Sequence, residues 1–183
     1  MLRTRVSVGM LVGAVFLGAL AADEPDTKSA KPKVDSKPTS LAWQRLKDLA
    51  GEWKLATAPN QADKGEIVAH YSLTAAGSTV VETLFPGGEK EMVTLYNRDG
   101  DQVMLTHYCC CGNQPQMRAA CGDAQDELVF EFAGGTNLDP AKDLHMHGYR
   151  VRFVDSNRIH GEWEYYRDGK SAGKHTFDLV RKK

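Results

Sequence analysis

The sequence has almost no net charge. Its 183 residues carry 23 basic and 24 acidic side chains, which gives a formal net charge of -1. Nucleic-acid binding relies on a basic face that releases counterions, so this composition gives it no electrostatic support. After residue 22 no apolar run approaches the roughly 20 residues that a transmembrane helix needs. We therefore expect no stable membrane insertion once the N-terminal segment is cleaved.

The sequence also lacks the short motifs of common enzymes. It contains no Gly-x-Ser-x-Gly elbow, no phosphate-binding glycine loop and no His-Glu-x-x-His. Cys-x-x-Cys-His is missing too, which excludes covalent attachment of a c-type haem. We predict no catalytic residue, and these absences favour a binding protein over an enzyme.

The first 22 residues have the features of a secretory signal peptide. Arg3 and Arg5 precede an apolar stretch that ends at Leu20, and Ala19 and Ala21 are small residues that suit signal peptidase. An uncleaved membrane anchor is the alternative. Residues 23–39 contain three prolines among lysine, aspartate and serine, which predicts a disordered linker. The sequence thus predicts an exported protein, periplasmic or extracellular, with one folded domain over residues 40–183.

The folded domain is predicted to be all-β after one short helix. The helix begins after Ser40 and ends before Gly51, because Ala42 and Leu46 fall on one apolar face. From Glu52 onward the apolar pattern has a period of two, with turn residues between short segments. The predicted strands are 52–57, 66–74, 78–85, 90–97, 102–110, 116–121, 127–133, 145–154, 158–166 and 174–181. Closing them into one antiparallel up-and-down β-barrel leaves no exposed edge.

The start of the barrel resembles the calycin superfamily. Gly51-Glu52-Trp53 matches the Gly-x-Trp of the first strand of lipocalins, where the tryptophan plugs the narrow end of the barrel. The resemblance implies that Arg181 corresponds to the basic residue that lipocalins stack over this tryptophan. Three further stretches, 81–87, 106–117 and 145–147, resemble an uncharacterised family of secreted bacterial proteins with THYC…GNQPxM and HMH motifs. That family implies a calycin-like barrel and no settled activity.

Strand alternation predicts an unusual interior. The side chains that share the inward side with large apolar residues include Glu82, His107, Cys109, His145, His147 and Trp163. Buried polar groups need hydrogen-bond partners, so we expect them to line a cavity for a small molecule. The predicted ligand-binding residues are Glu82, His107, Asn113, His147, Tyr149 and Trp163. Asn113 is included because it lies in a predicted loop over residues 112–115 at the rim of the cavity. The alternative is that this loop is a turn with a purely structural role.

The same alternation of side chains also places possible ligands for a metal ion on one face. His145 and His147 alternate on one strand, and His107 and Cys109 repeat this spacing on another. Imidazole and thiolate together are ligands for Zn or Cu. The alternative is a hydrogen-bonded polar lining without metal. Non-covalent haem, held through His147 or His175, is a third option.

The four cysteines predict a disulfide. An even number of cysteines is typical of exported proteins, and we expect a bond from Cys110 or Cys111 to Cys121 across a broad loop. A tight hairpin over residues 112–115 would place Cys121 too far from Cys109 to bridge. Buried free thiols are the alternative.

Three functions are therefore open. The leading hypothesis is a secreted, non-enzymatic small-molecule-binding barrel. The second is a Zn- or Cu-dependent protein or enzyme that uses the interior His/Cys/Glu cluster, and the third is a structural or interaction module of the cell envelope. The sequence does not indicate the ligand or the oligomeric state.

Overall fold

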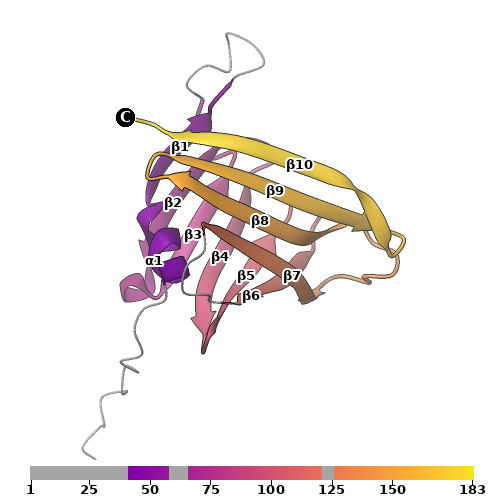
Figure 1. Cartoon of the computed structure of the whole chain (residues 1–183). Helices are drawn as coiled ribbons and strands as arrows, with labels where there is room; N and C mark the ends of the chain where they lie inside the picture. The colour runs from indigo at the N-terminus through magenta and orange to yellow at the C-terminus, as the bar shows by residue number, and fades with distance from the viewer. Residues whose placement is uncertain (1–40, 58–65, 121–125) are drawn as a thin grey trace, which may run out of the picture. The chain divides into compact units, whose positions relative to one another are not determined.

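The computed structural model describes residues 41–57, 66–120 and 126–183 (Figure 1). The elements are α1 (Leu41–Asp48), β1 (Gly51–Leu55), β2 (Ala69–Thr74), the 3-10 helix η2 (Ala75–Gly77), β3 (Thr79–Leu84), β4 (Met92–Asp99), β5 (Gln102–Tyr108), β6 (Gln114–Ala120), β7 (Glu127–Thr136), β8 (His145–Asp155), β9 (Arg158–Arg167) and β10 (Lys170–Arg181). The predicted signal peptide and linker lie outside the described residues. Within the described ranges no helix has the length and apolarity to cross a membrane.

The strands close into one antiparallel up-and-down barrel. Each strand pairs with the next along the chain, and β10 pairs with β1 to complete the ring. The predicted all-β barrel and its ten strands are confirmed, with boundaries that shift by a few residues. The period of two explains why: on β5, Val103, Leu105 and His107 are buried in the interior, while the side chains between them are more exposed. The closed barrel is compatible with a calycin-like fold.

One hairpin differs from the prediction. The loop expected at 112–115 lies earlier, because the Gly112 N–H donates to the Cys109 carbonyl (2.9 Å) and the Cys109 N–H donates to the Asn113 carbonyl (3.1 Å). Strand β6 then begins at Gln114, and Pro115 is its second residue. Proline is tolerated near the start of a strand, where its missing N–H removes the fewest ladder bonds. The register of the β5–β6 pair therefore joins Thr106 to Gln116.

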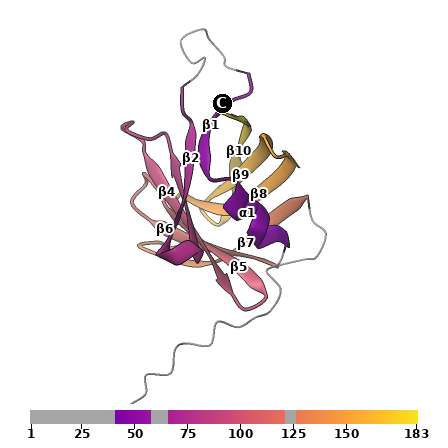
Figure 2. The same ribbon diagram turned by 90° about the vertical axis from the view of Figure 1, so that its left-hand side faces the viewer.

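The helix α1 closes one end of the barrel (Figures 1 and 2). Its Leu46 is buried, as is Trp53 at the start of β1, and the Trp53 indole N–H donates to the Leu49 carbonyl at 2.8 Å. The Arg181 guanidinium lies 4.5 Å from the centre of the Trp53 ring. It also donates to the backbone carbonyls of Asp48 and Ala50, both at 2.7 Å. The contact that the lipocalin resemblance implied for Arg181 is thus present, and it ties the last strand to the end of α1.

Candidate functional site

A cavity of about 480 Å³ lies at the barrel end opposite α1. Its walls come from the ends of β3, β5 and β9 and from the beginnings of β4, β8 and β10, which meet at this end because the strands alternate in direction. The lining residues are Leu84, Phe85, Lys90, Met92, His107, Cys109, Cys110, Cys111, Leu144, His145, Met146, Trp163, Tyr165, His175 and Phe177. Most of them are apolar or aromatic, Lys90 supplies a cation, and none of the described lining residues is a carboxylate.

His107 is the most distinctive polar group of this wall. Its ring is buried, lies 4.8 Å from the Trp163 ring between centroids, and has Nδ1 2.9 Å from the Thr94 hydroxyl. Its Nε2 has no hydrogen-bond partner among the described residues. Burial lowers the pKa of His107 to about 4, because the apolar surroundings disfavour the imidazolium ion. The ring is therefore neutral at physiological pH. His107 and Trp163 line the cavity, as alternation predicted.

Glu82 lies deeper, behind the cavity wall. Its carboxyl is fully buried and accepts hydrogen bonds from Tyr71 at 2.6 Å and Tyr96 at 2.5 Å. Burial raises the pKa of Glu82, against the opposing effect of the hydrogen bonds from Tyr71, Tyr96 and Thr94. The third phenol near it is Tyr149, which stacks on Trp163 at 4.0 Å. Glu82 and Tyr149 were both predicted to contact a ligand, and neither lines the cavity.

The hydrogen bonds around Thr94 connect Glu82 to the cavity. Thr94 is the cross-strand neighbour of Glu82 on β3 and of His107 on β5. Its hydroxyl interacts with Glu82, which lowers the pKa of that carboxyl, and lies 2.9 Å from Nδ1 of His107. The Nε2 at the cavity wall accepts a hydrogen bond in one tautomer of His107 and donates one in the other.

A register shift in β8 interrupts the alternation from which His145 and His147 were predicted to share the inward side. Met146 pairs with Tyr165 and Gly148 with Glu164, so His147 is an extra residue in a β-bulge. His145 lines the cavity, whereas His147 lines a recess on the outer wall.

The two imidazoles are nevertheless joined. The Nε2 of His145 lies 2.9 Å from the Nδ1 of His147. The Nδ1–H of His145 donates to the Asp143 carbonyl at 2.8 Å, so its Nε2 accepts from His147. The His147 ring stacks on Tyr166 at 3.7 Å and on Phe132 at 4.5 Å. Burial, and secondarily His145, lowers the pKa of His147.

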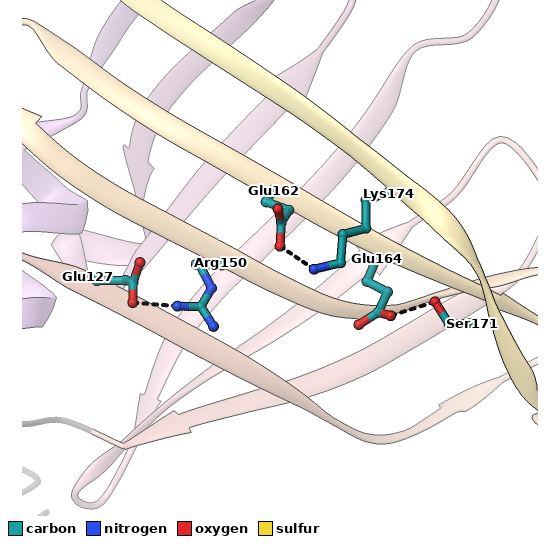
Figure 3. A network of polar contacts seen from close by, with 6 residues as sticks. All are labelled: Glu127, Arg150, Glu162, Glu164, Ser171 and Lys174. Atoms are coloured by element: carbon teal, nitrogen blue, oxygen red, sulfur yellow. Dashed lines mark hydrogen bonds and ion pairs between the residues drawn. The ribbon is translucent and has the colours of Figure 1, made fainter.

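The outer recess is framed by ion pairs between neighbouring strands (Figure 3). Arg150 contacts Glu127 at 2.7 Å, Lys174 contacts Glu162 at 2.8 Å, and the Ser171 hydroxyl donates to Glu164 at 2.5 Å. Most of these charges are partly exposed, and exposed pairs contribute about 0–1 kcal/mol each. Four of the five charged lining residues, Arg150, Glu162, Glu164 and Lys174, already have partners, so this solvated wall is a weak candidate for a ligand site.

Asn113 has a structural contact. Its side-chain amide donates to the Leu144 carbonyl at 2.8 Å and thereby fastens the β5–β6 turn to the start of β8. Asn113 is buried and does not line the cavity. Its Oδ1 has no partner within the described part of the chain. The contact of Asn113 with a ligand stays a prediction. The bond to Leu144 agrees with the alternative, a turn with a structural role.

The four predicted metal ligands do not converge on one point. His107, Cys109 and His145 line the cavity, and His147 faces outward. In the described ranges a single set of three or more His, Cys, Asp or Glu side chains has ligand atoms within 4.8 Å of one another, and it consists of Cys109, Cys110 and Cys111. Zn or Cu ligation by the predicted residues and haem ligation by His175, an exposed residue of the cavity wall, stay predictions.

The three described cysteines are free thiols. Cys109 is buried, while Cys110 and Cys111 are exposed at the cavity mouth. Burial raises the pKa of Cys109 to about 12, so this thiol is protonated at neutral pH and is a poor nucleophile. Cys121, the predicted disulfide partner, lies outside the described residues. Ala120 pairs with Gln102 at the barrel end that α1 closes, away from Cys110 and Cys111.

Sequence reasoning missed part of the cavity wall. Tyr165 shares its side of β9 with Trp163, so alternation could have found it. Phe85 and Lys90 were predicted as the last and first residues of the strands 78–85 and 90–97. In the structure both lie outside β3 and β4, Phe85 with a φ of 52°, so alternation does not give the direction of their side chains.

Comparison with known proteins adds no identity to this geometry. The sequence matches no protein-family model, and no curated protein matches it significantly. The candidate site is therefore described by its own chemistry: a mainly apolar cavity with three imidazoles, one ammonium group and three thiols, in which Nε2 of the buried His107 has no partner among the described residues.

Proposed function

We propose that this protein holds a small, mainly apolar molecule in the cavity at the open end of its barrel and does so without catalysis. The observation that carries the proposal is the unpartnered Nε2 of His107 on the wall of an otherwise mainly apolar cavity. Buried polar atoms nearly always have a hydrogen-bond partner, so an orphan at a cavity wall indicates where a ligand group binds. The volume of about 480 Å³ lies within the range of small-molecule sites.

The wall chemistry restricts the ligand. Because Nε2 of His107 accepts or donates according to the tautomer, the ligand presents a polar group that hydrogen-bonds to it at that point. The Trp163 and Tyr165 rings provide flat apolar contact area. Lys90 is the charged residue of the described wall, and no carboxylate opposes it, so a neutral or anionic group is tolerated near the mouth. A cationic ligand is disfavoured.

We also propose that the protein works outside the cytoplasm as a calycin-like carrier. The support is the signal-peptide pattern of residues 1–22 and the likeness of the secreted-family motifs at 81–87, 106–117 and 145–147. Each of these three motifs supplies a cavity residue: Leu84, His107 and His145. The contact between Arg181 and Trp53 agrees with the lipocalin resemblance.

The cavity can be tested with anilinonaphthalene sulfonate, which combines an aromatic body, an N–H donor and an anionic group. Calorimetric titration of the folded protein should show saturable binding of one probe per chain. Met146→Trp adds bulk to the cavity wall and should abolish it. His107→Phe keeps an aromatic ring and removes the hydrogen-bonding Nε2, so the dissociation constant should rise roughly tenfold, the equivalent of about 1.4 kcal/mol for one hydrogen bond.

The matched control is His160→Phe, the same exchange at a residue whose Nδ1 contacts Asp178 and which does not line the cavity. It should leave the affinity unchanged. Full probe binding by Met146→Trp, or an equal loss in the His160 variant, would refute the cavity as the binding site. Native mass spectrometry of the protein taken from its own compartment then identifies the natural ligand by its mass.

A further inference from the structure

We propose that Cys109, Cys110 and Cys111 form a binding site for one Cu(I) ion at the mouth of the cavity. Their sulfur atoms all lie within 4.8 Å of one another. Cys109 is buried and the other two are exposed, so the group reaches from the barrel interior to solvent. We call these three side chains the thiol triad.

The β5–β6 turn explains how three consecutive side chains meet. On a strand, successive side chains point to opposite faces, and three in a row cannot share a ligand. Here the Gly112 N–H donates to the Cys109 carbonyl at 2.9 Å and reverses the chain, with Gly112 at a φ of 86° that favours glycine. The amide of Asn113 holds the turn to Leu144. Backbone hydrogen bonds thus gather the thiols before any ion arrives.

The donor atoms of the triad are soft. Besides the three thiols, the same cavity wall contains the thioethers of Met92 and Met146 and the imidazoles of His107, His145 and His175, with no carboxylate among its described residues. None of the imidazoles belongs to the group whose ligand atoms lie within 4.8 Å of one another. Thiolate and thioether ligands select Cu(I), whereas Mg²⁺ and Ca²⁺ require oxygen ligands. Zn²⁺ in structural sites takes four ligands, and this group offers three. Metal–sulfur bonds of about 2.3 Å would place three sulfurs roughly 4 Å apart around one ion, which falls within the 4.8 Å that bounds their separations here.

The charge and proton balance is simple. Three thiols lose three protons and bind one Cu(I), which leaves a complex of charge 2− and transfers no electron. The ammonium group of Lys90 lines the same cavity and partly offsets this charge. Binding should therefore release protons and weaken as the pH falls.

The test is an anaerobic titration of the reduced full chain with Cu(I) in the presence of the chelator bicinchoninate. We expect the protein to withdraw one Cu(I) per chain from the chelator, and X-ray absorption should show sulfur neighbours. The double variant Cys110→Ser/Cys111→Ser alters two exposed side chains and should lose the ion at the same chelator concentration. Its circular dichroism should match that of the wild type, which shows that the ion is lost without loss of the fold.

Cys121→Ser is the matched control, since Cys121 is the one cysteine of the sequence outside the thiol triad. This variant should retain the ion. Three results would each overturn the proposal: no withdrawal of Cu(I) from the chelator, retention by the double variant, or an equal loss in the Cys121 variant. Coordination by nitrogen and oxygen alone would do the same.

Discussion

Tyr96 donates a hydrogen bond of 2.5 Å to Glu82 inside the barrel, where both side chains are almost wholly shielded from solvent. Tyr71 donates to the other carboxylate oxygen at 2.6 Å. A carboxyl group in an apolar interior is costly unless its oxygens are satisfied. The two phenols from β2 and β4 therefore reduce the free-energy cost of burying the Glu82 carboxyl at the centre of the core.

Glu82 should make the protein less stable as the pH rises. Burial raises its pKa above 4.5, so the native state keeps this proton to higher pH than the unfolded chain. The stability that Glu82 contributes is fully present below pH 4.5 and is lost as the pH rises through the native pKa. Glu82→Gln cannot ionise. In urea unfolding, the free energy of unfolding of Glu82→Gln relative to that of the wild type should increase from acidic to mildly alkaline pH. The exposed Glu89→Gln should follow the wild type at every pH. Parallel profiles for wild type and Glu82→Gln would contradict this account.

His107 should act in the opposite sense. Its native pKa of about 4 lies below the ordinary 6.5, so the unfolded chain binds this proton more readily. The stability is present above pH 6.5 and declines as the pH falls toward 4, by up to about 3 kcal/mol. His107→Phe should remove this decline. In an NMR titration of the metal-free protein, the chemical shift of the His107 ring should still be that of the neutral form at pH 6. The His107→Phe variant lacks this signal and so identifies it. A midpoint near 6.5 would disprove the effect.

Arg181 should stabilise the closed end of the barrel beyond its charge. Arg181→Lys keeps the cation but cannot stack on Trp53 and donate to two carbonyls at once. We expect a loss of about 1–3 kcal/mol in the free energy of unfolding. Arg152→Lys, on the exposed face of β8, is the control and should change it by less than about 0.5 kcal/mol. Equal effects of the two exchanges would show that the contacts at Trp53 contribute nothing.

Gly173 should be irreplaceable next to the cavity. A Cβ at this position would lie 2.5 Å from the Tyr165 hydroxyl, and the φ of 143° is strained for other residues. Gly173→Ala should cost about 1–3 kcal/mol and, by displacing Tyr165 from the cavity wall, alter the affinity for anilinonaphthalene sulfonate. Gly100→Asn is the control, because it has open space and a φ of 59° that asparagine tolerates. Wild-type stability and affinity in Gly173→Ala would rule out the clash.

The barrel could be predicted because short segments of the sequence specify its strands and turns. Alternation along 102–108 and turn residues such as Asp99-Gly100 are visible in the sequence, and closure follows from the need to cover edges. The inward direction of Glu82 was equally predictable. Its partners were not, because Tyr71 and Tyr96 meet it through cross-strand register, which the pattern of a single strand does not contain.

The site was harder to predict because it depends on irregular backbone. One inserted residue in β8 turns His147 to the outer wall, and alternation has no means of anticipating a bulge. The thiol triad lies in a turn, where a period of two does not apply. Reading Pro115 as a loop residue also displaced the hairpin, and with it the expected surroundings of Cys109.

The pairing of β1 with β10 has a consequence for biogenesis. Trp53 and Arg181 are opposite each other in the ladder, although nearly the whole domain separates them in the chain. Loop-closure entropy makes such a contact one of the last to form. The ring cannot be completed until residues through Arg181 have emerged from the ribosome or the export channel, and until then β1 and β9 each expose an edge that another chain can join. Folding of this domain should therefore follow its synthesis rather than accompany it.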